Sequence, residues 1–416
     1  MRFVLISTHV DQITGYSKVA HNMLKQLATL TPRVKVYHFG FQRHPGKPGL
    51  RKVPEGVVSY DAAANEDPVE EGFGFNKCKE YLDMVNPDIV MIYNDPLIIG
   101  KFLETLKYSK ASSTFKLWVY VDQVYHGIAP TLMDKIRTEA DRVYAFTDSW
   151  ATALTQYGTF PDVKVLEHAV DPFMFKQLTE RERVALRANM NLPKDAVVFL
   201  NVNRNSQRKR LDLTLGGFAE LLSRRTDKPY YLILATGLNP QSGAYYDVQR
   251  IFQTEITERG LPPAMLQRLL LIDTSGQSIL GDDAINGLYN AADIGVNTSD
   301  GEGFGLCQLE HMYTGAPQIV TDVGSYRSFL DDKVAEFIKP VSHQWFAGSM
   351  PLGATSMVFL YQDVAAAMER MADTLVERKR AVASYSFKTW SQVCDGWLED
   401  VLMEAGMSSQ ATIGSA

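Results

Sequence analysis

Short apolar runs alternate with segments of helical periodicity along most of the chain. In the first half these runs predict strands at 3–7, 34–39, 57–60, 89–93, 117–122, 142–146 and 163–167. In the second half they predict strands at 197–202, 230–235, 269–273, 294–297, 318–321 and 335–338. Helical periodicity is clearest at 16–30, 211–224, 284–291 and 363–380. Strands that alternate with helices in this way are typical of parallel sheets covered by helices.

A chain of 416 residues is too long for one ordinary hydrophobic core. The repeated pattern therefore predicts the α/β fold class, with two Rossmann-like domains facing a cleft and ligands at the carboxyl ends of the strands. A proline at 172 followed by a charged helix places the hinge near 172–180, so the predicted domains are 1–172 and 173–385. A helix is predicted over 387–402, and the small polar tail 408–416 is expected to be disordered.

The composition narrows the class of protein. It is 45% hydrophobic and 22% charged, as in soluble globular proteins, and its net charge of −6 argues against a nucleic-acid partner. No apolar run approaches the roughly 18 residues of a membrane span, and the first residues lack the features of a signal peptide. The three cysteines, Cys78, Cys307 and Cys394, are too far apart for a disulfide framework or a zinc site. We expect a cytoplasmic protein with no transmembrane segment.

The glycine-rich turn at 300–305 carries the strongest chemical signal. It follows a predicted strand and precedes a helical run over 306–314, an order that presents backbone N–H groups to a phosphate. Glu302 and Glu310 stand eight residues apart, which spans at most ~12 Å of helix axis. This spacing suits a ligand with hydroxyls at both ends and a phosphate between them, such as a nucleotide sugar. A helix start with a solvated glutamate remains the alternative.

A basic turn follows the predicted strand 197–202. Arg204 and Lys209, five residues apart, can converge on one anion there, since arginine offers a planar fork and lysine a point charge. Arg208 and Arg210 flank them and are expected to be solvated or to act indirectly. A plain solvated basic turn remains the alternative for this segment taken by itself.

The segment from Glu302 through Gly303, Phe304 and Gly305 to Glu310 resembles the E-x7-E block of retaining glycosyltransferases with the GT-B fold, most closely family 4. The resemblance implies that Glu302 holds the hydroxyls of the donor sugar and that Glu310 holds the ribose diol. It implies that the N–H groups of Phe304 to Leu306 meet the sugar and the distal phosphate. Arg204 and Lys209 would bind the diphosphate. The last helix, 386–405, would cross back onto the first domain.

The first domain offers weaker matches. Gly15 and Tyr16 follow the first strand, where this family often has two glycines near the diphosphate. Family members commonly carry a histidine after the strand that ends here at Asp122. We favour Asp122 for that catalytic position and keep His126, four residues later, as the alternative.

The resemblance implies retaining transfer of a hexose from a nucleoside diphosphate sugar to a hydroxyl of a glycan or glycoconjugate. No Asp-x-Asp motif is present, so the cations are expected to replace a metal, and no cofactor is expected. Asp273, at a strand end, can accept hydrogen bonds from guanine, which places GDP-mannose ahead of UDP-glucose. A sugar-nucleotide epimerase with the same fold and a non-catalytic nucleotide-sugar-binding protein remain alternatives. The helix at 16–30 carries few basic residues, so peripheral membrane contact is unsupported.

Overall fold

The computed structural model describes residues 1–43, 51–160, 162–275, 280–345 and 355–406, and the tail predicted at 408–416 lies outside these ranges. The chain divides into two compact units. Unit 1 contains residues 1–169 and the C-terminal segment from 388, and unit 2 contains 170–346 and 355–387. The chain thus crosses between the units at 169/170 and at 387/388, where the sequence placed the crossings at 172/173 and 385/386.

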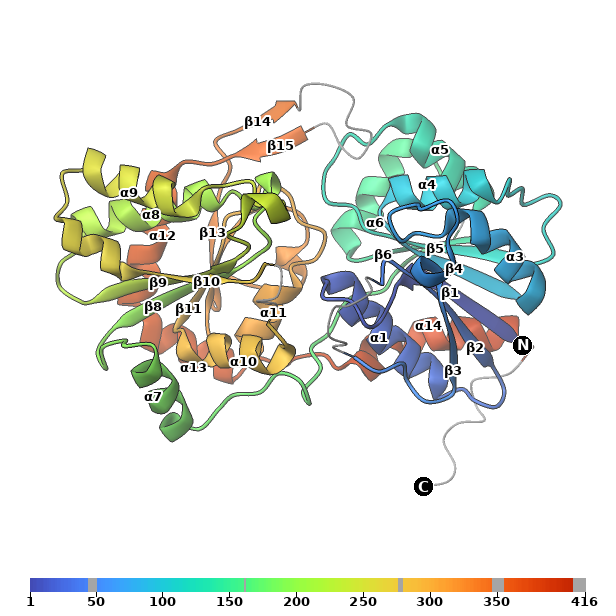
Figure 1. Cartoon of the computed structure of the whole chain (residues 1–416), viewed down its shortest axis with the longest axis horizontal. Coiled ribbons are helices and arrows are strands. Elements are labelled where there is room, and N and C mark those ends of the chain that lie inside the picture. Colours follow the sequence, from blue (N-terminus) through green and yellow to red (C-terminus); the bar gives the residue numbers. More distant parts are fainter. Residues whose placement is uncertain (44–50, 161, 276–279, 346–354, 407–416) are drawn as a thin grey trace. The chain divides into compact units, whose positions relative to one another are not determined.

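Unit 1 is a parallel seven-stranded sheet with the order β3-β2-β1-β4-β5-β6-β7. Its strands are β1 (Arg2–Thr8), β2 (Lys35–Phe41), β3 (Val57–Asp61), β4 (Ile89–Asn94), β5 (Lys116–Val121), β6 (Arg142–Ala145) and β7 (Val163–Val165). Its helices are α1 (Gly15–Ala28), α2 (Ala62–Asn65), α3 (Phe75–Val85), α4 (Pro96–Thr105), α5 (Pro130–Glu139), α6 (Asp148–Leu154), η1 (Thr155–Tyr157) and α14 (Trp390–Glu404). Helices α1 and α14 contact each other on one face, and α3, α4 and α5 pack together on the other (Figure 1).

Unit 2 repeats the arrangement with a parallel six-stranded sheet of order β10-β9-β8-β11-β12-β13. Its strands are β8 (Val197–Val202), β9 (Tyr230–Thr236), β10 (Leu269–Asp273), β11 (Ile294–Asn297), β12 (Gln318–Thr321) and β13 (Ala335–Ile338). Its helices are α7 (Glu180–Asn189), α8 (Leu211–Arg224), α9 (Val248–Glu258), α10 (Asp282–Ala291), α11 (Leu306–Tyr313), α12 (Tyr361–Asp373) and α13 (Leu375–Ala383). Short 3₁₀ turns are η2 (Gln207–Lys209), η3 (Pro240–Ser242), η4 (Pro263–Arg268) and η5 (Tyr326–Ser328).

Both predicted parallel sheets are therefore confirmed, and two details of unit 2 differ from the prediction. The helix predicted over 363–380 is two helices, α12 and α13, which meet at Thr374. An antiparallel hairpin, β14 (Ser342–Trp345) with β15 (Thr355–Val358), was not predicted. The hairpin is attached to the glycine-rich turn, because the N–H of Met357 donates to the carbonyl of Asp300 (3.4 Å).

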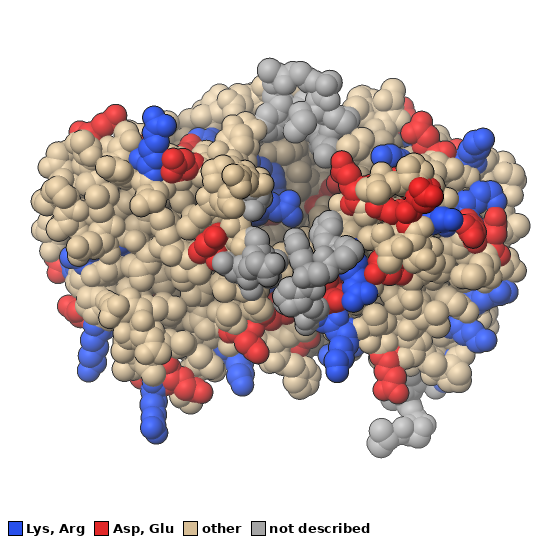
Figure 2. Space-filling model, viewed as in Figure 1, with Lys and Arg blue, Asp and Glu red and all other residues tan. Residues whose placement is uncertain are grey.

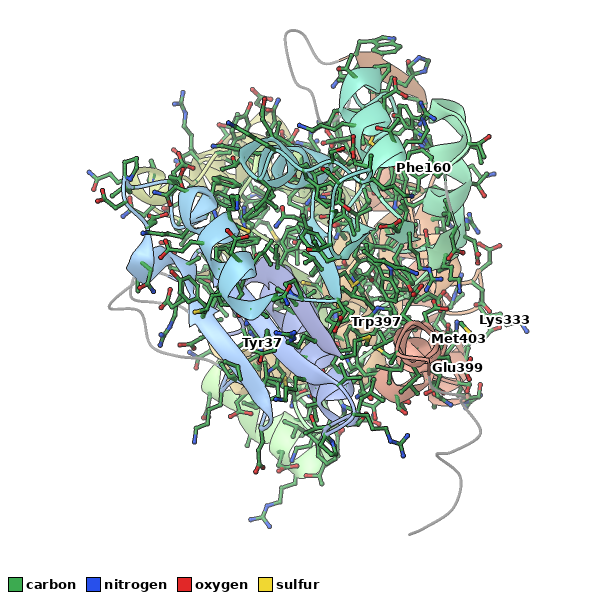
Figure 3. All side chains as sticks on the ribbon, turned by 90° about the vertical axis from the view of Figure 1, so that its right-hand side faces the viewer. Tyr37, Phe160, Lys333, Trp397, Glu399 and Met403 are labelled. Carbon is green, nitrogen blue, oxygen red and sulfur yellow. The ribbon has the colours of Figure 1, made fainter. Side chains whose placement is uncertain are left out.

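The C-terminal helix α14 packs on unit 1, as the resemblance implied. Trp397 is 2% exposed and its ring meets that of Phe3 on β1 with centroids 6.0 Å apart. Figure 3 shows Trp397 on the side of α14 toward the sheet, with Glu399 and Met403 on the outer side. Apolar positions spaced by three and four residues thus bury one stripe of this helix.

The charges of the surface are mixed in sign. The chain has 42 Lys and Arg and 48 Asp and Glu, and both kinds are interspersed over the face shown in Figure 2. In the part of the chain that the structure describes, no helix is long and apolar enough to cross a bilayer.

Candidate functional site in unit 2

Two loops of unit 2 meet where the strand order reverses. Strands β8 and β11 are hydrogen-bonded neighbours although two other strands separate them in the sequence. Their carboxyl ends therefore bring together the β8–α8 loop, which contains Lys209, and the β11–α11 loop, which contains Glu302. Such a switch point is where ligands bind in open α/β sheets.

Buried side chains tie the β8–α8 loop to the end of β11. Thr298 donates to the carbonyl of Arg210 (2.8 Å), and its hydroxyl lies 2.7 Å from that of Thr214. Asn201 on β8 donates to Thr214 (3.0 Å). All three side chains are fully buried, and buried polar groups are costly unless they are paired. The network therefore fixes the backbone around Lys209.

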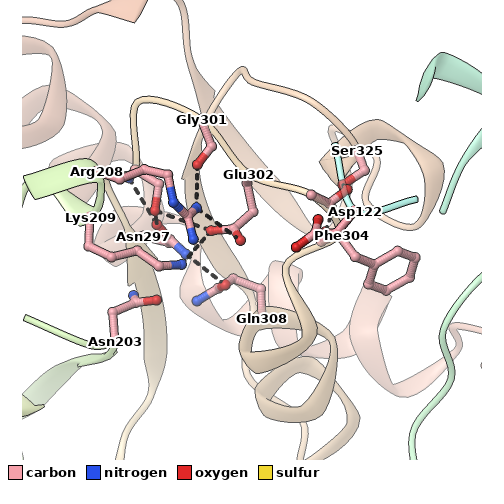
Figure 4. Close-up of polar contacts among 12 residues, drawn as sticks. Asp122, Asn203, Arg208, Lys209, Asn297, Gly301, Glu302, Phe304, Gln308 and Ser325 are labelled. Carbon is pink, nitrogen blue, oxygen red and sulfur yellow. Dashed lines mark hydrogen bonds and ion pairs between the residues drawn. The ribbon is translucent and has the colours of Figure 1, made fainter. Parts of the chain in front are cut away.

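Glu302 binds two cations from this loop, one on each carboxylate oxygen. Lys209 Nζ lies 2.5 Å from Oε2, and a guanidinium nitrogen of Arg208 lies 3.2 Å from Oε1 (Figure 4). Arg208 also donates to the carbonyl of Gly301 (2.5 Å). We refer to Glu302, Lys209 and Arg208 as the ion trio. Sequence reasoning treated Arg208 as an indirect neighbour, because spacing cannot show which side of a 3₁₀ turn each residue faces.

Glu302 and Lys209 are nearly enclosed, whereas Arg208 is partly exposed. Glu302 is 8% exposed. Burial opposes ionisation of its carboxyl, but Lys209 and Arg208 outweigh burial and lower its pKa to about 2. Burial lowers the pKa of Lys209 from its ordinary value, and Glu302 opposes that shift. The ion trio therefore contains an ionised carboxylate, Glu302, between two cations, Lys209 and Arg208.

The glycine-rich turn is shaped by Gly305. This residue has φ +96°, and a Cβ placed on it would lie 2.3 Å from the Tyr326 ring. Ser325 donates to the carbonyl of Phe304 (2.9 Å), whose ring stacks on Phe329 with centroids 4.9 Å apart. Helix α11 then begins at Leu306, and the first N–H groups of a helix have no partner within the helix and favour an anion.

Glu310, at the other end of the motif, has a different environment. It is 2% exposed, and its Oε2 accepts a hydrogen bond from the hydroxyl of Tyr289 on α10 (3.0 Å). Tyr289 is itself stacked on His311, with ring centroids 5.0 Å apart. Sequence reasoning did not find Tyr289, since it precedes Glu310 by 21 residues and no local pattern connects the two.

Two further expected donor residues, Arg204 and Asp273, lie outside the ion trio. Arg204 is exposed, and among the described residues no ion pair is found for its side chain, whereas Arg208 binds Glu302. Asp273 uses Oδ1 to accept from the N–H of Leu238 (3.0 Å) and from the N–H and hydroxyl of Ser275 (2.9 and 2.6 Å). The Ser275 hydroxyl, with the backbone donors, lowers the pKa of Asp273. Asp273 therefore holds the backbone at Leu238 and Ser275.

In unit 1 the structure brings Tyr16 and Asp122 together. Tyr16, next to Gly15 at the start of α1, donates its hydroxyl to Asp122 Oδ2, directly after β5. Burial, with the nearby Asp122 carboxylate, raises the pKa of Tyr16. His126 is exposed and its ring lies 5.1 Å from that of Trp150. The structure thus joins Asp122 to the start of α1.

The next feature is the placement of side chains that could bind a metal ion. Over the described ranges, no group of three or more His, Cys, Asp or Glu side chains is placed to hold a metal ion. The positive groups at the glycine-rich turn are Arg208 and Lys209.

Known proteins resemble this chain in sequence and in fold. The family model of glycosyl transferases group 1 matches residues 197–350. A D-inositol 3-phosphate glycosyltransferase of Saccharomonospora viridis is 27% identical over 283 residues, which cover 67% of this chain and 59% of that protein. The chain spans about half the length of the curated relatives it matches.

Solved structures match nearly the entire chain. Sucrose-phosphate synthase from Thermosynechococcus elongatus has a TM-score of 0.71 at 17% identity, with 97% of this chain and 99% of that chain covered. HepE of Anabaena, solved in complex with UDP-glucose, has a TM-score of 0.64 at 16% identity, with 96% and 99% covered. At these identities the likeness concerns the fold.

Proposed function

We propose that this chain is a glycosyltransferase of the GT-B fold that transfers a hexose from a nucleoside diphosphate sugar to an acceptor hydroxyl, which its likeness to known glycosyltransferases supports. The observation that carries the proposal is the ion trio at the switch point of unit 2, whose Glu302 stands eight residues before Glu310. Lys209 and Arg208 supply the positive charge for a diphosphate, and Glu302 and Glu310 supply acceptors for sugar and ribose hydroxyls.

The proposed reaction retains the anomeric configuration and needs no metal. Positive charge near the leaving diphosphate stabilises the charge that develops as the glycosidic bond breaks. The start of α11 adds N–H groups on the same side, and the rest of the protein's contribution is positioning. Asp122 in unit 1, held by Tyr16, is the side chain that we assign to the acceptor reaction.

The donor base is the least constrained part of the proposal. Asp273 at the end of β10 would accept from guanine, which favours GDP-mannose, and its Oδ1 is already engaged by Leu238 and Ser275. HepE, a structural neighbour, was solved with UDP-glucose, so that donor is the competing choice. If Asp273 reads guanine, Asp273→Ala weakens GDP binding and leaves UDP binding unchanged. Equal behaviour of GDP and UDP in the variant would refute this assignment.

The acceptor class is a glycan or glycoconjugate hydroxyl, and polyol and sugar phosphates are worth assaying first. The curated relatives are named for D-inositol 3-phosphate, and a solved neighbour is a sucrose-phosphate synthase.

The test is a transfer assay that measures release of the nucleoside diphosphate. We expect release to depend on the acceptor, to continue in EDTA, and to fall at least ~100-fold in Lys209→Ala and in Glu302→Ala, the effect of losing one preorganised contact. Full activity in both variants would contradict the site assignment. Turnover of the donor without an acceptor would instead indicate an epimerase.

A further inference from the structure

The ion trio has a second consequence for ligand selection. Glu302 occupies both cations in this structure, with Lys209 Nζ 2.5 Å from one oxygen and Arg208 3.2 Å from the other. The hydroxyl of Ser299 lies 3.2 Å from Oε2, so both oxygens have partners. The side-chain exposures are 10% for Glu302, 12% for Lys209 and 28% for Arg208. An anionic ligand that reaches these cations must therefore share them with an internal carboxylate.

The charge of Glu302 is permanent at physiological pH. Burial opposes its ionisation, but the two cations lower its pKa to about 2, so it stays an anion. A diphosphate placed on Lys209 and Arg208 comes close to this carboxylate, and like charges that are poorly hydrated repel each other. Hydroxyl groups of an attached sugar can donate hydrogen bonds to Glu302 and so replace its ion pairs with Lys209 and Arg208.

We propose that Glu302 is a specificity-determining residue that acts as an internal competitor for the diphosphate, so that the site favours an intact nucleotide sugar over the free nucleoside diphosphate. This inference rests on the proposed function. A sugar nucleotide brings hydroxyls for Glu302 together with its phosphates, whereas a free nucleoside diphosphate displaces Glu302 without replacing its bonds. The reaction product would therefore leave readily.

The proposal predicts how anion affinity changes with the net charge of the ion trio. That charge is +1 in the parent protein, +2 in Glu302→Gln, 0 in Arg208→Gln and +1 in the double variant. Calorimetric titration with inorganic pyrophosphate should therefore rank Glu302→Gln tightest, the parent and the double variant in between, and Arg208→Gln weakest. We expect Glu302→Gln to bind on the order of tenfold more tightly than the parent, which equals ~1.4 kcal/mol.

Glu310→Gln is the matched control. It removes one negative charge from the same motif but leaves the ion pairs of Lys209 and Arg208 with Glu302 in place. Its pyrophosphate affinity should equal that of the parent protein. If Glu310→Gln tightens binding as much as Glu302→Gln does, the effect is a general loss of negative charge and the proposal is wrong.

A second comparison separates this proposal from the proposed function. The affinities for free UDP and GDP are measured beside those for their sugar nucleotides. In Glu302→Gln the free nucleoside diphosphate should bind more tightly and the sugar nucleotide more weakly than in the parent, so the preference for the intact donor should narrow. If the parent binds nucleotides but Glu302→Gln weakens pyrophosphate and the free diphosphates, the internal-competitor role is wrong and the proposed function stands. If the parent binds neither nucleotides nor pyrophosphate, the proposed function itself fails. Should Glu302→Gln not fold, Arg208→Gln binding pyrophosphate as tightly as the parent would overturn the proposal.

Discussion

Glu302 shows how strongly one side chain depends on its neighbours. A carboxyl with 8% exposure would resist ionisation, yet Lys209 and Arg208 lower its pKa to about 2. Because this pKa lies below the unfolded value of about 4.3, the ion trio stabilises the fold fully above that value. The contribution is lost as the pH falls toward 2, so neutral conditions leave it intact.

Gly305 is required by both backbone and space. Its φ of +96° is strained for any other residue, and a Cβ there would lie 2.3 Å from Tyr326. We expect Gly305→Ala to lower the free energy of unfolding of unit 2 by about 1–3 kcal/mol, as measured by urea denaturation. Gly243→Ala, with φ +84° and no atom within 4 Å of the added Cβ, is the control for backbone strain alone. An equal loss of unfolding free energy in the two variants would show that the contact with Tyr326 adds no cost.

Tyr289 is expected to position Glu310 for the ribose diol. Tyr289→Phe removes only the hydroxyl that donates to Glu310 Oε2. One hydrogen bond to a charged group contributes about 1.5–3 kcal/mol, so the affinity for the preferred nucleoside diphosphate should fall by roughly tenfold or more. The 2′,3′-dideoxy analogue should bind the variant and the parent alike. Equal weakening of both ligands would mean that Tyr289 serves only the packing of α10.

The sequence predicted which loops form the site better than which side chains meet. The ion pair of Lys209 with Glu302 was not predicted, since the sequence assigned Lys209 to the diphosphate and Glu302 to the sugar hydroxyls. Arg208 reaches Glu302 because the 3₁₀ turn at 207–209 and the left-handed Arg210 (φ 44°) set the direction of its side chain. The direction of the Arg208 side chain depends on its contact with Gly301 in the loop after β11. Because Gly301 lies 93 residues away in the sequence, local spacing cannot predict this contact.

Helix α14 is held on unit 1 by charge as well as by its apolar stripe. Asp400 is 1% exposed, and its oxygens bind Lys164 (2.5 Å), the hydroxyl of Tyr144 (2.8 Å) and Arg142 (3.3 Å). The apolar stripe was visible in the sequence, but these partners lie on β6 and β7, more than 200 residues earlier, and were not.

Asp400→Asn should therefore loosen α14. Removing one partner of a buried ion pair costs about 3–5 kcal/mol, so urea denaturation should show a loss of this size for unit 1. Amide hydrogen exchange in α14 should accelerate more than exchange in β1. Glu399→Gln, an exposed neighbour on the same helix, should behave as the parent. A parent-like Asp400→Asn would show that the apolar stripe alone holds the helix.

Elements without a strong pattern were the ones that sequence reasoning missed. Every residue of β14 is exposed, so this strand has no apolar alternation to reveal it. The hairpin is positioned by its contacts with the Asp300 loop, including a 3.2 Å hydrogen bond from Ser356. The break between α12 and α13 at Thr374 was hidden because apolar positions continue across it, from Met371 to Val382.

Across the entire protein, buried histidines should govern acid sensitivity. Burial lowers the pKa of His38, His168 and His311 to about 3, below the unfolded value of about 6.5. The unfolded chain binds more protons between these values, so stability falls as the pH drops from about 6.5 toward 3. Each histidine contributes a slope of up to ~1.4 kcal/mol per pH unit. Unfolding free energies of His38→Gln should fall less steeply with acid than those of the parent, and an unchanged slope would contradict the assignment.

The two-unit α/β fold was the most predictable feature, because most of its parallel strands, such as β1, β4 and β8, are buried apolar runs. All 13 parallel strands were found near their predicted positions. Their order within each sheet follows from the general preferences of doubly wound sheets, and it places the predicted loops at the switch points.

Nucleotide binding by the ion trio decides between this function and its alternatives. Calorimetric titration of the parent and of Lys209→Ala with UDP, GDP, ADP and dTDP, each with magnesium and with EDTA, would measure it. We predict that one nucleotide binds the parent selectively, that EDTA leaves the affinity unchanged, and that Lys209→Ala weakens binding by at least ~100-fold. The proposed donor site would be contradicted if binding needs magnesium, if Lys209→Ala binds as the parent does, or if none of the four nucleotides binds.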